Sequence, residues 1–151
     1  MSGGTAGEPF ARPSGLERVF NRLFGALVGL GFGLRHNYLL EVRGRSSGRL
    51  YSMPVNLLES GGRRYLVAPR GYTQWVRNVH ASAEVSLRKG RHRERCHVSA
   101  VPDEEKPEVL KAYLDRFTPT VQRYFPVPAG SPASAFRSLA ARYPVFELRP
   151  T

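Results

Sequence analysis

The chain has 151 residues, 41% of them hydrophobic, which is enough for one domain with a real core and excludes wholesale disorder. Lysine and arginine number 23 against 12 aspartate and glutamate, so the formal net charge is +11 at pH 7. This surplus favours an anionic partner, and charge alone leaves nucleic acid, anionic lipid and an anionic cofactor open. The single cysteine, Cys96, excludes an intrachain disulfide and is compatible with a reducing cytoplasm.

The beginning of the chain is expected to hold a leader and one helix. Residues 1–14 are rich in glycine, serine and threonine without a secretory-signal pattern, so we expect a disordered leader there. Apolar residues recur at steps of three and four from Leu16 onwards, which predicts an amphipathic helix. The simpler interpretation packs this helix on the domain. The alternative lays it on a membrane surface, with Arg18 and Arg22 towards the headgroups.

Three strand-like segments follow in quick succession. Residues 38–42, 50–58 and 64–68 are rich in β-branched, aromatic and other apolar side chains, and the sequences GRSSG and ESGG that separate them are typical of turns. We therefore expect a meander of hairpins. Pro54 lies inside the second of these strands, which predicts an edge, a bulge or a kink at that position.

The remainder of the chain mixes helices with strands. The expected elements are a helix at 73–81 capped by Thr73, strands at 84–87 and 93–101, a helix from Asp103, a proline-rich loop at 118–132 in which one helical turn is left open, a helix at 134–142 and a strand at 145–148. This order predicts an α+β fold around an antiparallel sheet that curls into a barrel. We expect one domain over residues 15–151.

The sequence contains no familiar metal-binding or hydrolytic pattern. His92 and His97 lie an odd number of positions apart and so face opposite sides of a strand, and there is no Cys-x-x-Cys pair. We therefore expect no metal site. A nucleophile elbow and a close pair of carboxylates are both missing, and Cys96 is expected to pack in the core.

Two short segments instead suggest anion binding. GRSSGR, residues 44–49, gathers arginines, serines and glycines at a hairpin tip, where N–H and guanidinium groups can hold an anion. APRGYTQW, residues 68–75, places Arg70 and Gly71 just before a helix N-terminus, which also favours anions. Each segment alone would be a solvated turn. Together, and with an apolar strand at residues 53–55, they suit a ligand with a flat aromatic head and a charged tail.

A third basic segment is the best case for nucleic acid. The hairpin at residues 88–95 carries Arg88, Lys89, Arg91, Arg93 and Arg95. A stacking platform would interleave aromatic residues with these cations, and none is present. We therefore interpret the hairpin as a solvated end and expect no specific nucleic-acid partner.

Residues 40–87 resemble the deazaflavin-dependent nitroreductase family, whose members are coenzyme F420-dependent oxidoreductases with a split β-barrel fold. The family pattern has a Gly-Arg-x-Ser-Gly hairpin, then Pro and an apolar residue, a Val-Ala strand end, and Gly, Trp and Asn in that order. The positions that match the pattern are Gly44, Arg45, Ser47, Gly48, Pro54, Val55, Val67, Ala68, Gly71, Trp75, Asn78, Ala81 and Val85. The segment from Arg70 to Trp75 is shorter than the usual family loop, and Ser82-Ala83 replaces the expected x-Pro.

The resemblance implies a Greek-key split barrel of the FMN-binding type with flanking helices. It also implies hydride transfer from reduced F420 to an electron-poor acceptor such as a nitroaromatic or a quinone. The implied contacts are Arg45, Ser47, Gly48 and Arg49 for the phosphate and glutamyl tail, Met53, Pro54 and Val55 for the ring, Ala68, Arg70 and Gly71 for the rest of the cradle, and Trp75 and Asn78 near the ring and ribityl chain.

Several alternatives stay open at this point. FMN is the alternative cofactor, and a non-catalytic split barrel that binds a cofactor or a lipid is the alternative function. Tyr124 and Tyr143 are candidate proton donors, although a core or surface role is the simpler interpretation of each. We expect a cytoplasmic protein. Peripheral contact with the inner membrane face and a homodimer are both left open.

Overall fold

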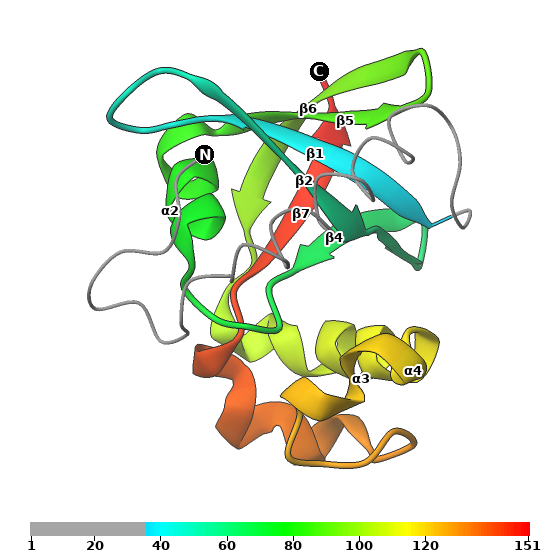
Figure 1. The fold of residues 1–151 in the computed structure, drawn as a ribbon. Coiled ribbons are helices and arrows are strands. Elements are labelled where there is room, and N and C mark those ends of the chain that lie inside the picture. Colours follow the sequence, from blue (N-terminus) through cyan, green and yellow to red (C-terminus); the bar gives the residue numbers. More distant parts are fainter. Residues whose placement is uncertain (1–35) are drawn as a thin grey trace.

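The computed structural model describes residues 36–151, so the predicted leader and amphipathic helix lie outside the described residues (Figure 1). Its strands are β1 (Asn37–Arg43), β2 (Leu50–Asn56), β3 (Leu58–Ser60), β4 (Arg63–Val67), β5 (Glu84–Lys89), β6 (His92–Ala100) and β7 (Val145–Pro150). They form one curled sheet of seven strands in the order β2-β1-β5-β6-β7-β4-β3, and every pair is antiparallel.

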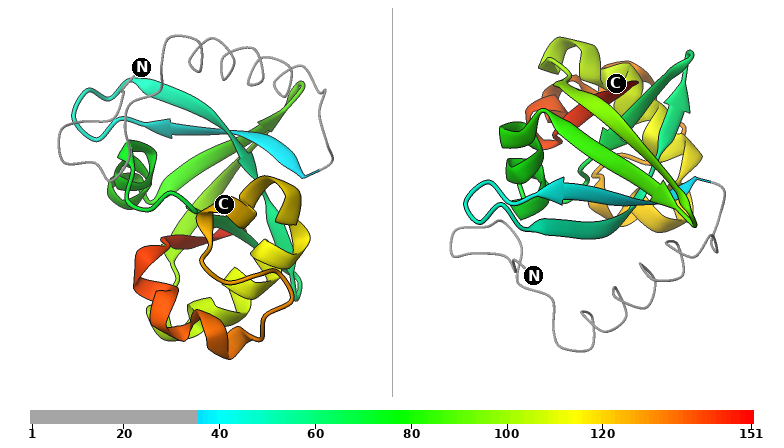
Figure 2. Two further views of the ribbon diagram at one scale, coloured as in Figure 1. Left: turned by 60° about the horizontal axis from the view of Figure 1, so that its bottom comes forward. Right: turned by 90° about the horizontal axis from the view of Figure 1, so that it is seen from above.

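Two groups of helices accompany the sheet. One helix, α2 (Gln74–Ser82), connects β4 to β5 and lies beside the tip of the β1–β2 hairpin (Figures 1 and 2). The second group lies between β6 and β7 and consists of η1 (Asp103–Glu105), α3 (Lys106–Arg116), α4 (Thr118–Val121), η2 (Gln122–Tyr124) and η3 (Ala133–Arg142). Within residues 36–151 there is no helix long and apolar enough to cross a bilayer.

Each group of helices has its own apolar core. The α2 core packs this helix on the sheet and includes Leu40, Val76, Val79 and Phe146. The α3 core packs the second group against the β3–β4 side and includes Leu58, Leu110, Leu114 and Phe136. The predicted stripe of α3 is confirmed, because Val109, Leu110, Tyr113, Leu114 and Phe117 are all buried.

Both hairpins of the expected meander form, as β1–β2 and β3–β4, but their shared middle strand is not continuous. The single strand predicted over residues 50–58 divides into β2 and β3, which end at opposite edges of the sheet. The cause lies at Leu57 and Leu58, both of which are buried, so the alternation of side chains breaks there. Leu57 packs in the α2 core and Leu58 in the α3 core. The strand β3 then pairs with β4, whose other partner is β7.

Pro54 lies where its chemistry allows. It belongs to β2, an edge strand, where it is opposite Leu39 of β1. A proline has no backbone N–H to donate to a neighbouring strand. An edge strand has a neighbour on one side only, so proline is tolerated there. The prediction of an edge at Pro54 is confirmed.

Candidate active site at the hairpin and helix α2

The tip of the β1–β2 hairpin is a tight turn that favours glycine at two positions. Gly48 has a φ of +72°, and a Cβ on Gly44 would lie 2.7 Å from Cε2 of Tyr51. The Gly48 N–H donates to the Gly44 carbonyl at 2.9 Å, and a guanidinium N–H of Arg43 donates to the Gly48 carbonyl at 3.0 Å. The shape of the tip is therefore set by its own hydrogen bonds.

Arg45 joins this tip to helix α2. Its backbone N–H and its Nη1 both donate to Oδ1 of Asn78, at 3.1 and 2.8 Å, and its Nη2 donates to Oε1 of Gln74 at 2.8 Å. Both acceptor residues are buried, with Asn78 3% and Gln74 7% exposed. These bonds bring together the two segments that the sequence predicts to bind an anion, which lie far apart along the chain.

Gln74 is a site residue that sequence reasoning missed. No motif marks it, and the one available signal was its spacing of four residues from Asn78, which puts both side chains on one face of a helix. Their shared partner, Arg45, lies 29 residues before Gln74 in the chain. The pairing therefore becomes visible only in the fold.

The N-terminus of α2 has unused hydrogen-bonding capacity. Gly71, with a φ of +88°, turns the chain towards the helix, and the Thr73 N–H donates to the Gly71 carbonyl at 3.0 Å. Thr73 occupies the N-cap position as predicted, but its side chain makes no capping bond. The first turn holds no acidic residue, so no carboxylate offsets the positive end of the helix dipole.

An apolar surface lies next to these polar groups. Met53 and Val55 are half-buried and pack against the α2 core together with Trp75, whose ring centroid is 6.4 Å from that of Phe146. Pro54 points to the other face of β2, because successive residues of a strand alternate. The three residues expected under one ring therefore do not share a face.

The two candidate proton donors lie elsewhere. The Tyr143 hydroxyl donates to the Tyr124 carbonyl at 2.6 Å, and both residues belong to or pack against the α3 core. Burial raises the pKa of Tyr143. The structure does not bring either tyrosine together with Met53 or Trp75, which pack against the α2 core.

The basic β5–β6 hairpin is largely paired within the domain. Arg93 donates to both carboxylate oxygens of Glu41, at 2.8 and 3.1 Å, and Arg95 donates to Glu84 at 2.8 Å. Arg91, at the tip, has no such partner among residues 36–151. This hairpin therefore offers fewer free cations to an anion than its sequence suggests.

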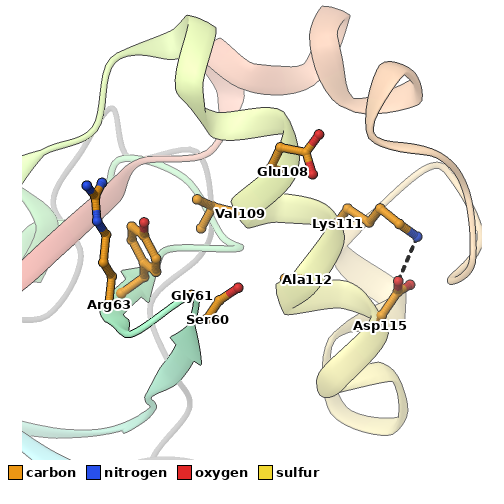
Figure 3. A pocket seen from close by; sticks show the side chains of 9 residues that line it. Ser60, Gly61, Arg63, Glu108, Val109, Lys111, Ala112 and Asp115 are labelled. Atoms are coloured by element: carbon orange, nitrogen blue, oxygen red, sulfur yellow. Dashed lines mark hydrogen bonds and ion pairs between the residues drawn. The ribbon is translucent and has the colours of Figure 1, made fainter.

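A groove of about 510 Å³ lies between the β3–β4 turn and α3 (Figure 3). Two of its polar side chains are paired, since Lys111 Nζ lies 2.8 Å from Asp115 Oδ2. Lys111 also donates to the Ser131 carbonyl at 2.9 Å. Hydrogen bonds from Lys111 and the Gly130 N–H lower the pKa of Asp115. The residues predicted to bind a cofactor are not among those that line this groove.

Comparison with known proteins identifies the family. The model of the family described as F420H(2)-dependent quinone reductase matches residues 16–124, which is more than half of the chain. The chain belongs to the F420H2-dependent quinone reductase family. Its cofactor is therefore coenzyme F420 and its activity that of an F420H2-dependent reductase, as the resemblance implied. A comparison with curated proteins finds no match.

Solved structures confirm the split-barrel fold. An F420-H2 dependent reductase (FDR-A) is 20% identical, with a TM-score of 0.53, over 76% of this chain and 95% of its own. A domain-swapped dimer is 19% identical, with a TM-score of 0.55, over 90% of this chain and all of its own. A putative pyridoxamine 5'-phosphate oxidase from Listeria innocua is 10% identical, with a TM-score of 0.51, over 77% and 84%.

The groups at the hairpin and α2 fit the cofactor of this quinone reductase family. The Arg49 guanidinium has no hydrogen-bond or ion-pair partner among residues 36–151, and its backbone N–H is held by Ser47 Oγ at 3.2 Å. Neither the hairpin tip nor the first turn of α2 contains a carboxylate. Cationic and N–H donors beside a half-buried apolar surface are what a phosphate-bearing tail and a planar ring require.

Proposed function

We propose that this reductase binds F420H2 between the β1–β2 hairpin and α2 and reduces a quinone or a similar flat, electron-poor acceptor. The observation that carries the proposal is the set of hydrogen bonds from Arg45 to Gln74 and Asn78. They unite a cationic hairpin tip and a helix N-terminus beside the apolar surface of Met53 and Val55. The family that the chain matches is named for quinone reduction, which supports the choice of acceptor.

We assign the charged and the apolar parts of the cofactor to different parts of the site. The phosphate and the glutamyl tail bind at the hairpin tip, and the deazaflavin ring lies on the apolar surface of β2 and α2. The proposed residues of the site are Arg45, Ser47, Gly48 and Arg49 at the tip, Met53 and Val55 on β2, Ala68, Arg70 and Gly71 before α2, and Trp75 and Asn78 on α2. Pro54 is left out because it points to the other face of β2.

The protein's own part in the reaction is orientation. Reduced F420 supplies the hydride when it is bound. The chain holds the charged tail at one end, which fixes the ring on Met53, Val55 and Trp75, and these apolar side chains keep water from the face that they cover. Tyr124 and Tyr143 have no place in this proposal, because the Tyr143 hydroxyl is bonded to a backbone carbonyl and both pack with the α3 core.

Turnover with a defined acceptor tests the proposal. We expect purified protein to oxidise F420H2 when menadione is added anaerobically, seen as a rise in the absorbance band of oxidised deazaflavin. A nitroaromatic acceptor tests the breadth of the acceptor class, and F420H2 with menadione but without protein is the control for the uncatalysed reaction. Tight binding of F420H2 without oxidation by any acceptor would contradict the proposal and favour a non-catalytic binding protein.

The proposal extends to assembly and location. We propose a leader at residues 1–14, a single domain over residues 15–151 and a cytoplasmic homodimer. The similarity to a domain-swapped dimer supports the homodimer. Contact with a membrane surface rests on the sequence pattern of the predicted amphipathic helix alone, since that helix lies outside the described residues.

A further inference from the structure

Thr73 has a buried hydroxyl without a hydrogen-bond partner. The residue is 4% exposed, and among the described residues its Oγ1 is the one buried side-chain oxygen or nitrogen that no group satisfies. A threonine at an N-cap usually accepts a hydrogen bond from the second or third N–H of the helix, and this side chain does not. Buried polar groups are normally paired. The hydroxyl therefore lacks a hydrogen-bond partner within residues 36–151, and a bound ligand could supply one.

The surroundings of this hydroxyl favour an anionic oxygen. The first N–H groups of α2 have no acceptor within the helix, and no acidic side chain lies in the first turn. The Arg45 guanidinium donates to Gln74, the residue next to Thr73, so the cationic hairpin tip lies against the same helix end. A positive helix end, an unpaired hydroxyl and a neighbouring cation form an environment that attracts phosphate or carboxylate.

We propose that Thr73 Oγ1 donates a hydrogen bond to an anionic oxygen in the charged tail of the bound cofactor. The tail site then has two walls, the hairpin tip and the N-terminus of α2. This inference rests on the proposed function and deepens it, because it names a ligand-binding residue on the helix. The ligand supplies the acceptor that the described chain lacks, so the hydroxyl contributes to binding and not to the stability of the free protein.

Two substitutions at this position separate the roles. Thr73→Val removes the hydroxyl at nearly constant shape, and Thr73→Ser keeps it. We expect F420 to bind the valine variant at least about tenfold more weakly in a fluorescence titration, because a hydrogen bond to a charged group is lost, and the serine variant about as well as the unchanged protein. The midpoint of thermal unfolding of the cofactor-free valine variant should not fall.

A shortened ligand identifies the part of the cofactor that Thr73 contacts. The deazaflavin riboside without phosphate and glutamates should bind the valine variant and the unchanged protein equally. An equal loss for both ligands would overturn the assignment to the anionic tail. Unchanged F420 affinity with a lower unfolding midpoint would overturn the inference and make Thr73 a structural residue. If the unchanged protein fails to bind F420, the proposed function itself fails, and the inference with it.

Discussion

Substituting Arg45 with glutamine is expected to lower the free energy of unfolding by about 2 kcal/mol and to weaken F420 binding at least about tenfold. The change removes the guanidinium bonds from Arg45 to the buried residues Gln74 and Asn78, while the backbone N–H of residue 45 still donates to Asn78 Oδ1. In a domain of this size the unfolding midpoint should fall by roughly 4–8 °C. Thermal unfolding and a cofactor titration measure the two effects.

The variant Arg45→Lys shows whether Arg45 acts by linking the hairpin to α2 through hydrogen bonds or only through its positive charge. Arg45→Lys keeps the positive charge, but a single ammonium cannot span Gln74 and Asn78 as the guanidinium fork does. We therefore expect this variant to remain defective in both stability and binding. Unchanged stability combined with lost binding would contradict a structural link between the hairpin and α2, since Arg45 would then act on the cofactor alone.

Replacing Arg49 with glutamine is expected to weaken F420 binding by roughly 10- to 100-fold while leaving stability nearly unchanged. The side chain is exposed and has no partner among the described residues, so its loss leaves no buried group unpaired. A charged hydrogen bond to the cofactor's tail is what disappears. Isothermal titration at low and moderate salt gives the affinity, and the variant should also show a weaker salt dependence.

Arg91→Gln is the matched control for this substitution. Arg91 is an exposed arginine at the tip of the other long hairpin, and it too lacks a partner within residues 36–151. Its removal changes the net charge by the same amount, so we expect unchanged F420 affinity. Equal losses in the two variants would show that overall charge, and not the hairpin tip, attracts the cofactor.

Local patterns in the sequence were enough to predict most elements. The stripe from Val109 to Phe117 predicted a helix whose apolar face is buried, and Pro54 predicted an edge, because both depend on neighbouring residues only. The strand order could not be predicted in the same way. The second partner of β4 is β7, about 80 residues later in the chain. The division at Leu57 follows from two separate cores that only the folded chain possesses.

In the candidate site, too, local patterns predicted the segments but not the hydrogen bonds between them. The two segments predicted to bind an anion were visible as arginine, glycine and helix-start patterns. The role of Arg45 in joining the hairpin to α2 was not visible, because its partners Gln74 and Asn78 lie 29 and 33 residues later in the chain. Thr73 was expected to cap the helix, yet its hydroxyl makes no capping bond. Hydrogen-bond partners depend on which distant segments meet, and spacing along the chain does not encode that.

A crystal structure of the protein with bound F420 tests the central claim most directly. We expect the tail within hydrogen-bond distance of Arg49 and Thr73, and the deazaflavin ring on the surface formed by Met53, Val55 and Trp75. Cofactor density in the groove beside α3 shown in Figure 3, or anywhere out of reach of Arg49 and the N-terminus of α2, would contradict the claim.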